Sequence, residues 1–479
     1  MESTMPHIAL LASPGMGHLI PVLELAQRLV SHQSFKVTLF VVSTDHASIT
    51  NTQLLQSLAD SDDDGDLLDI VLVPFVDVSD IVGPGVSFVD QIVVAVLRSL
   101  PFLKTEISKM ESPPSALVVD MFGTSALGIA DDFNMLKFVF VTSNARLFSV
   151  MLCTPEMDRK EIDEHVKNQT PLNIPGCKPL KFEDTFEVFF MDPSGPSYQG
   201  FIDAVIKMSL SDGILVNTWD ELEPFSLKAL KETKKAPIYP VGPLVRPTKK
   251  SVLCNEIIDW LDKQPKESVI YVSFGSGGTL STQQVIELAW GLELSQQRFV
   301  WVARPPIEND AAGNFLALGN GSDGTLNYLP EGFSARTQDL GLVIPMWAPQ
   351  VEILSHPSIG GFLTHGGWNS ALESIINGVP MIVWPLYSEQ KMNADILTED
   401  IGASIRVTMK PDRVVGREEI RSMVSKIMID HEGRNIRTRI KELKNSATKA
   451  VVEGGSSYTS LSQLAEICIQ RLKTKAYGA

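Results

Sequence analysis

Cysteine is scarce in this chain of 479 residues, which contains four. They are far apart, and their spacing matches neither a disulfide framework nor the close pairs of a zinc site. Because stable disulfides accumulate in oxidising compartments, the sequence predicts reduced thiols and a cytoplasmic protein. The four are Cys153, Cys177, Cys254 and Cys468.

Long apolar runs and excess basic charge are also lacking. No apolar stretch approaches the roughly 18 residues that a membrane span needs. The first apolar run follows Glu2 and is broken by Pro14, so we interpret it as a β-strand and not as a signal peptide. A formal net charge of −16 argues against nucleic acid and anionic membranes as partners, because both require basic surface.

Short apolar runs alternate with helix-like stretches in both halves of the chain, and a hydrophobic content of 44% is enough to fill two cores. This alternation is typical of parallel sheets covered by helices on both faces, an α/β fold with doubly wound domains. We predict an N-terminal domain (1–242), a linker (243–252), a C-terminal domain (253–456) and a terminal helix (457–479). The main strands are expected at 7–12, 36–42, 68–74, 117–119, 138–141, 269–274, 341–346, 359–363 and 379–384, and two long helices at 19–29 and 281–294.

The loop after the first expected strand contains a candidate catalytic base. Its sequence, SPGMGH, uses two glycines for a tight turn, so His18 is expected to project from the start of the following helix. Asp120 ends another expected strand of the same sheet. A carboxylate beside one imidazole nitrogen fixes the tautomer and leaves the other nitrogen free to accept a proton. The two residues therefore form a candidate base and its support.

The stretch from Trp347 to Gln390 has the residue types needed to bind a nucleotide. Trp347 follows an apolar run and offers an indole as a stacking surface for a base. Residues 364–370 form a glycine-containing turn that opens a helix, and the free N–H groups of a helix N-terminus favour a diphosphate. Glu373 lies on the same helical face as Asn369, within reach of a ribose diol.

Further polar residues complete this candidate site. Tyr387, Glu389 and Gln390 follow the next apolar run, and their groups suit hydrogen bonds to sugar hydroxyls. The loop GSGG at 275–278 is a weak phosphate signal by itself, and Ser276 is a candidate for contact with the diphosphate.

The same stretch resembles the donor-binding signature of the plant secondary-product glycosyltransferases, the family 1 enzymes that use UDP-sugars. The shared motifs include WAPQ, HPS, GGF, GWNS, LES, NGVPM, WP and the terminal glutamine. The resemblance covers essentially the whole chain and implies the GT-B fold, in which two Rossmann-like domains face a cleft. It implies a donor site made of Ser276, Trp347, Ala348, Gln350, His365, Gly367, Trp368, Asn369, Ser370, Glu373, Tyr387, Glu389 and Gln390.

The family's base is a histidine in a PGxGH loop, and its partner is an aspartate after the fourth strand, which correspond to His18 and Asp120 here. The implied reaction is an inverting transfer of glucose from UDP-glucose to a hydroxyl, without a metal or bound cofactor. We also expect the protein to be a monomer. A terminal glutamine is the type associated with glucose, whereas histidine there goes with galactose.

Within the family, PGMGHLIP, VVDMFGTSAL, SFGSGGTLS and WPLYSEQKMNA are most similar to the hydroquinone (arbutin-forming) glucosyltransferases. Their acceptors are small phenols, and some members also use nitrogen or sulfur acceptors. Aromatic residues of the first half are candidates for a pocket near His18, although several of them are equally expected in the core. The candidates are Phe88, Met121, Phe122, Asn144, Phe148, Phe186 and Phe190.

Three positions depart from the family's commonest pattern. Gly366 stands where cysteine is frequent, and Glu389 is one methylene longer than the usual aspartate. Asn144 falls where a hydroxyl residue often contacts the sugar, so that contact is less secure.

Other functions fit the sequence less well. The acidic run at 60–66 contains D-x-D triplets that hold a metal in another glycosyltransferase class, but its Asp, Ser and Gly residues are typical of a solvated loop. A Ser/His/Asp hydrolase would need a G-x-S-x-G elbow, which is absent from the sequence. A nucleotide-sugar sensor without activity would not need His18 beside Asp120.

Overall fold

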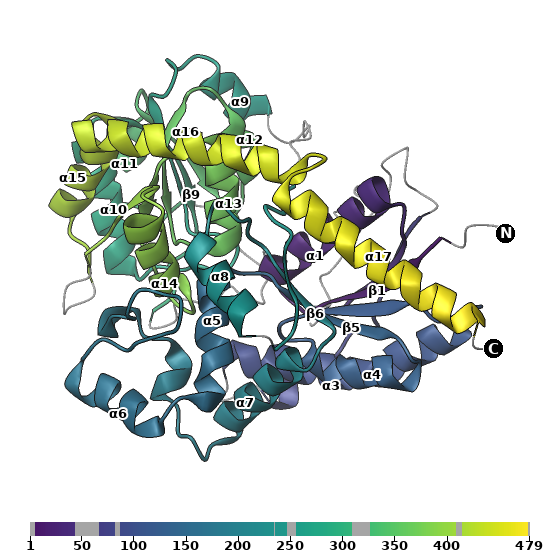
Figure 1. The fold of residues 1–479 in the computed structure, drawn as a ribbon. Helices are drawn as coiled ribbons and strands as arrows, with labels where there is room; N and C mark the ends of the chain where they lie inside the picture. The colour runs from purple at the N-terminus through teal and green to yellow at the C-terminus, as the bar shows by residue number, and fades with distance from the viewer. Residues whose placement is uncertain are drawn as a thin grey trace. The chain divides into compact units, whose positions relative to one another are not determined.

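The computed structural model describes residues 5–43, 67–81, 87–233, 235–246, 255–308, 326–408 and 414–477 (Figure 1). The chain divides into two compact units. The first contains Met1–Val245 and Lys449–Ala479, and the second contains Arg246–Thr448. Most of the expected linker, the acidic run at 60–66 and Cys254 lie outside the described residues.

The first unit is built on a seven-stranded sheet in the order β3-β2-β1-β4-β5-β6-β7. Every pairing in it is parallel. The strand order reverses between β1 and β4, and ligands of open α/β sheets bind beyond the carboxyl ends of the strands at such a point. The strands are β1 (His7–Ala12), β2 (Lys36–Val41), β3 (Leu68–Leu72), β4 (Ala116–Asp120), β5 (Leu136–Val141), β6 (Gly213–Val216) and β7 (Ile238–Pro240).

Helices cover this sheet and connect its strands. The longer ones are α1 (Met16–Gln33), α3 (Phe88–Lys109), α4 (Leu127–Asp132), α5 (Ala145–Cys153), α6 (Arg159–Asn168), α7 (Pro196–Ser209), α8 (Pro224–Glu232) and α17 (Ser456–Tyr477). Short 3₁₀ turns are η1 (Ser79–Ile81), η2 (Thr124–Ala126), η3 (Thr154–Glu156), η4 (Phe182–Asp184) and η5 (Glu187–Phe190). The segment between β5 and β6 thus consists of loops and mostly short helices.

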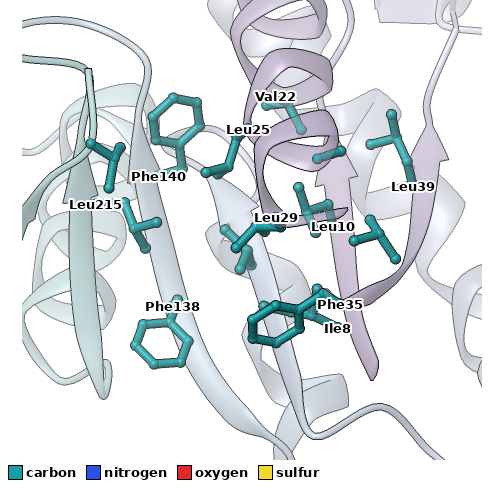
Figure 2. Packing of buried hydrophobic residues seen from close by; sticks show 14 of the residues in the cluster. Ile8, Leu10, Val22, Leu25, Leu29, Phe35, Leu39, Phe138, Phe140 and Leu215 are labelled. Atoms are coloured by element: carbon teal, nitrogen blue, oxygen red, sulfur yellow. The ribbon is translucent and has the colours of Figure 1, made fainter. Parts of the chain in front are cut away.

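The core under α1 fixes the start of that helix relative to β1. Figure 2 shows Val22, Leu25 and Leu29 of α1 lying over Ile8 and Leu10 of β1, and all five are buried in one cluster. Burying each such side chain contributes about 1.5–3 kcal/mol. The α1 helix is therefore held firmly against the sheet, with its first turn at the carboxyl end of β1.

The terminal helix α17 belongs to the same core. Leu461, Leu464, Ala465 and Cys468 are buried in the cluster with the residues of α1 and β1. The Ser457 hydroxyl donates to the Gly242 carbonyl at 2.5 Å, which ties the start of α17 to the end of the first sheet. Burial raises the pKa of the Cys468 thiol to about 12, so this cysteine stays a neutral core residue.

The second unit has a six-stranded parallel sheet in the order β10-β9-β8-β11-β12-β13. Its order reverses between β8 and β11, which gives this sheet its own ligand-binding edge. The strands are β8 (Val269–Ser273), β9 (Arg298–Ala303), β10 (Gly341–Pro345), β11 (Ile359–Thr364), β12 (Met381–Val383) and β13 (Ser404–Arg406).

The helices of this part of the chain close its core. Helices α10 and α15 pack together closely at Gly291, where a Cβ would lie 2.6 Å from Ile420. The helices are α9 (Asn255–Leu261), α10 (Thr282–Ser295), α11 (Phe333–Arg336), α12 (Gln350–Ser355), α13 (Trp368–Asn377), α14 (Gln390–Asp395), α15 (Arg417–Met428) and α16 (His431–Val451), with a π-helical turn, η7, at Ile396–Asp400.

The expected strands are present, and their ends shift by at most two residues. The largest differences concern α1, which begins at Met16 and ends at Gln33, whereas the prediction was 19–29. The helix starts earlier because Gly15, with φ of 103°, makes the turn that begins it. In consequence His18 lies within the first turn of α1. Among the described residues, no helix is long and apolar enough to cross a membrane.

Candidate active site

The first candidate site lies where the strand order of the first sheet reverses. His18 follows β1, and its backbone N–H donates to the Gly15 carbonyl at 3.0 Å, which places it in the opening turn of α1. Its side chain is mostly buried, with 8% of the residue exposed. Asp120 is the last residue of β4, the neighbouring strand. The two predicted catalytic residues therefore meet at this edge of the sheet.

Asp120 is fully buried and held by a set of donors. Its Oδ2 accepts from the Ser13 backbone N–H at 2.8 Å, and its Oδ1 accepts from the Ser13 hydroxyl at 2.6 Å. The backbone N–H groups of Phe122 and Gly123 also donate to Oδ1, at 3.0 and 3.1 Å. The carboxylate is thus fixed in one orientation.

The carboxylate faces the imidazole directly. Asp120 Oδ2 lies 3.3 Å from His18 Nδ1. Burial tends to raise the pKa of Asp120, but the nearby His18 ring and the hydrogen bonds from Ser13 outweigh burial and leave that pKa below its ordinary value. Asp120 is therefore ionised at neutral pH, ready to stabilise an imidazolium at His18.

Two predicted acceptor residues lie beside this pair. The Phe122 ring packs against the His18 ring, with centroids 4.7 Å apart and the planes tilted by 36°. Met121 is the first residue after β4, is partly buried, and its sulfur receives a weak hydrogen bond from Thr142. Phe122 therefore gives the candidate base an apolar, flat neighbour.

The predicted acceptor residues of α5 have structural positions. Asn144 is fully buried and caps the helix, because its Oδ1 accepts from the Leu147 N–H at 2.8 Å. Phe148 is also fully buried. The carboxylate of Glu223 accepts from the first two N–H groups of the helix and completes the cap. As the structure stands, Phe148 has no surface to offer a ligand.

The remaining acceptor candidates are farther along the chain. Phe186 makes edge contacts with Phe189 and Phe201, and Phe190 is 52% exposed and packs edge-on against Phe182. Phe88 is the first residue of α3 and is partly buried. Their part in acceptor binding stays a prediction.

The second candidate site lies at the β8/β11 edge of the second sheet and contains His365. Its ring lies between two glycines from different loops. A Cβ on Gly275 would lie 2.4 Å from Cε1 of His365, and a Cβ on Gly367 would lie 2.5 Å from its Nε2. Burial, with a smaller effect from the Arg304 charge, lowers the pKa of His365 to about 4. The imidazole is therefore neutral at pH 7 and acts as a hydrogen-bonding group.

The first turns of α12 and α13 are joined by side chains. Nε2 of Gln350 donates to the Ser370 hydroxyl at 2.9 Å and to Glu373 Oε2 at 2.7 Å. Trp368 is buried, with 3% exposed, so it anchors the start of α13, and Asn369 follows it in the same turn. These residues surround the N-terminus of a ten-residue helix, a position that favours an anion.

Trp347 stands at the end of β10 as an open aromatic surface. It is 61% exposed, whereas Ala348, the next residue, is buried. Met346 before it has a φ of 65°, which turns the chain sharply after the strand. An exposed indole on a fixed turn is the surface that a planar base requires.

The segment after β12 is tied to the His365 loop. Oε1 of Gln390 accepts from the backbone N–H groups of Leu386 and Tyr387 at 2.9 and 3.2 Å. The Asn393 amide donates to the Gly366 carbonyl at 2.9 Å and to Glu389 Oε1 at 3.3 Å. Burial is the main reason why the pKa of Tyr387 rises to about 12, so its phenol stays protonated.

Three residues that the sequence analysis did not single out support these sites. Ser13 orients Asp120, Asn393 joins the two loops of the second site, and Arg304 binds the carbonyl of Ser276. A signal existed for Arg304, because a charged residue directly follows the apolar strand 299–303. Ser13 and Asn393 had no such signal.

A family model described as UDP-glucoronosyl and UDP-glucosyl transferase matches residues 241–436. UDP-glycosyltransferase 72E1 of Arabidopsis thaliana is 46% identical to the chain, over 100% of both sequences. The chain belongs to the UDP-glycosyltransferase family. It is therefore an enzyme, as the motifs predict.

A second curated relative and a solved structure support the same family assignment. The hydroquinone glucosyltransferase of Rauvolfia serpentina is 42% identical over 97% of this chain and 98% of its own length. The crystal structure of TcCGT1 in complex with UDP has a TM-score of 0.89 and 44% identity, and the match covers 98% of this chain and 100% of that one. The predicted fold class, with two Rossmann-like domains of the GT-B type, is confirmed.

The family assignment leaves the roles of individual residues as predictions. Within the described ranges, no group of three or more His, Cys, Asp or Glu side chains is placed to hold a metal ion. Cys153, Cys177 and Cys468 are free thiols.

Proposed function

We propose that this glycosyltransferase transfers glucose from UDP-glucose to the hydroxyl of a small phenol, with inversion at the anomeric carbon, to give a β-glucoside. The observation that carries the proposal is the placement of His18 Nδ1 3.3 Å from the fixed, ionised carboxylate of Asp120. A nucleotide-sugar-binding protein without activity would have no need of this pair.

The chemistry follows from the orientation of His18. Its Nδ1 faces Asp120, so we assign the proton of the neutral ring to Nδ1 and leave Nε2 as the base. Nε2 takes the proton of the acceptor hydroxyl as its oxygen forms a bond to the anomeric carbon. The bond between that carbon and UDP breaks at the same time, and UDP leaves with the electron pair. General-base catalysis of this kind contributes about 10²–10⁴ in rate.

The second site supplies the binding of UDP. Trp347 stacks on the uracil, Gln350 and Glu373 bind the ribose side, and the N-terminus of α13 receives the diphosphate. His365 and Ser370 add hydrogen bonds to the leaving group, which would otherwise carry its charge without stabilisation. Support comes from the structural relative, which contains UDP in its crystal structure.

Glucose is the proposed sugar because of the residue types after β12. Glu389 offers a carboxylate and Gln390 an amide for the hexose hydroxyls, and a glutamine at this position resembles the glucose-using members of the family. Gln390→His should therefore lower the use of UDP-glucose relative to UDP-galactose. An unchanged ratio of the two rates would remove Gln390 from sugar selection.

Small phenols are proposed as acceptors because a flat aromatic ring, Phe122, packs on His18 and because a relative is named for hydroquinone. We further propose that the reaction needs no metal, since the α13 N-terminus and its neighbours provide the stabilisation of the diphosphate. Rates measured with EDTA should equal those without it, and a strong loss in EDTA would contradict this part of the proposal.

The test is product formation followed by mass spectrometry. The purified protein is incubated with UDP-glucose and a panel of small phenols, together with matched aromatic thiols and amines. A hexose mass increment on the phenols, with β configuration by NMR, is the expected result. Products on thiols or amines alone would replace the acceptor class. In parallel incubations with other UDP-sugars, products that form only with one of these sugars would replace glucose as the donor sugar.

A further inference from the structure

Arg304 connects two loops of the second site. It directly follows β9, and its Nε donates to the Met346 carbonyl at 3.0 Å. Its Nη1 donates to the Ser276 carbonyl at 2.7 Å and is 3.5 Å from the Gly278 carbonyl. One guanidinium therefore holds the glycine loop after β8 together with the turn after β10 that presents Trp347.

The charge of Arg304 influences the pKa values of two residues of the same site, His365 and Tyr387. It is the second cause, after burial, of the lowered pKa of His365. At Tyr387, where burial raises the pKa, the charge of Arg304 opposes that rise. Burial lowers the pKa of Arg304 itself, but a guanidinium stays protonated in proteins. A partly buried positive charge thus lies near His365, Tyr387 and the loop of Ser276.

This charge has no carboxylate among its described hydrogen-bond acceptors, which are all backbone carbonyls. His365 is neutral at pH 7, and a helix N-terminus provides about half a unit charge. A nucleoside diphosphate carries more negative charge than the neutral His365 and the helix N-terminus can neutralise. A full positive charge at this edge of the sheet would reduce the remaining imbalance.

We propose that Arg304 is a positioning residue of the donor site, which fixes the loops after β8 and β10 and whose charge favours the diphosphate of the bound nucleotide. The inference rests on the proposed function, because it presupposes that UDP occupies this site. It assigns to the charge of Arg304 a contribution that depends on the diphosphate, separate from the support that its hydrogen bonds give to the Trp347 turn.

The experiment compares the binding of UDP and of uridine by isothermal titration calorimetry, at constant ionic strength. Arg304→Gln should weaken the binding of UDP at least tenfold more than it weakens the binding of uridine, because both ligands use the Trp347 turn that Arg304 holds, whereas the loss of charge affects the diphosphate alone. Arg304→Lys keeps the charge and should retain most of the wild-type ratio of the two affinities.

The matched control is Arg298→Gln. Arg298 is the first residue of β9, roughly 20 Å from Arg304 along an extended strand, so this variant removes the same charge from the same strand away from the site. It should bind UDP and uridine like the wild type. Equal losses from Arg298→Gln and Arg304→Gln would mean that only the overall charge of the protein matters, and would overturn the proposal.

Other outcomes separate the inference from the proposed function. If the wild type does not bind UDP, the proposed function fails. If the wild type binds UDP and Arg304→Gln binds it equally well, or loses UDP and uridine to the same extent, Arg304 has no role at the diphosphate and the inference alone fails. Should Arg304→Gln not fold, as judged by circular dichroism, a folded Arg304→Lys that loses the wild-type affinity ratio would also refute it.

Discussion

Replacing Asp120 with asparagine should slow glucosyl transfer strongly while leaving the donor affinity almost unchanged. All hydrogen bonds described for this carboxylate come from donors, namely the backbone N–H and hydroxyl of Ser13 and the N–H groups of Phe122 and Gly123. An asparagine can keep the three bonds to Oδ1 only by placing its NH₂ group at Oδ2. That group then faces the Ser13 N–H and His18 Nδ1.

The magnitude follows from this mismatch. Facing an NH₂ donor, His18 would present Nδ1 as an acceptor and carry its proton on Nε2, where the base should be. The general-base contribution would then be lost, which corresponds to a fall in kcat of about 10²–10⁴. The Ser13 N–H would remain buried without an acceptor, at a cost of about 1–3 kcal/mol in the free energy of unfolding.

The assay measures initial rates of UDP release for the wild type, Asp120→Asn and Ser13→Ala, with UDP affinity determined separately. Ser13→Ala is the matched control, because it removes one hydrogen bond to Oδ1 and leaves the carboxylate facing His18. It should lower kcat only a few-fold. Turnover of Asp120→Asn equal to that of the wild type would refute the role of Asp120, and an equal loss of kcat and UDP affinity would indicate a folding defect instead.

Three further predictions concern single residues. Trp347→Ala should weaken UDP binding roughly 5- to 150-fold, as expected for the loss of about 1–3 kcal/mol of stacking. It should change the free energy of unfolding by less than about 0.5 kcal/mol, because the indole is exposed. An unchanged UDP affinity by calorimetry would exclude stacking on this indole. Phe148→Ala should destabilise the protein by about 3–5 kcal/mol because its ring is fully buried, and a denaturation curve like that of the wild type would contradict this. His365 has a pKa of about 4 in the folded protein against an ordinary 6.5, so the unfolded chain takes up the proton first as pH falls, and the folded state loses stability between these two pH values. From pH 7 to pH 5, the loss in the free energy of unfolding attributable to His365 should be about 2 kcal/mol. The urea midpoint of His365→Gln should therefore shift less than that of the wild type over this pH range.

Much of the framework could be predicted from local sequence. The buried parallel strands are short apolar runs, and polar or glycine residues mark their carboxyl ends. Since functional side chains of such sheets follow these ends, His18, Asp120 and the residues after β10, β11 and β12 could be assigned to sites before the structure was known. Helix limits were less predictable, because α1 begins at a glycine turn and not at the first apolar residue.

Contacts between distant segments could not be predicted. Ser13 bonds to Asp120 only because β1 and β4 are neighbours in the sheet, 107 residues apart in sequence. The surroundings of His365 depend on glycines from the loops after β8 and β11, and those of Arg304 on carbonyls from the loop after β8 and the turn after β10. Periodicity also could not tell whether Phe148 lines a pocket or belongs to the core, since both positions select an aromatic side chain.

The most direct test of the account is a comparison of the wild type and His18→Ala for transfer and for donor binding. Product formation from UDP-glucose and a phenol is followed by mass spectrometry, and the affinity for UDP is measured on the same preparations. The account predicts that His18→Ala forms little or no glucoside and binds UDP with nearly the wild-type affinity. Glucoside formation by His18→Ala at the wild-type rate would contradict the central claim that His18 is the base.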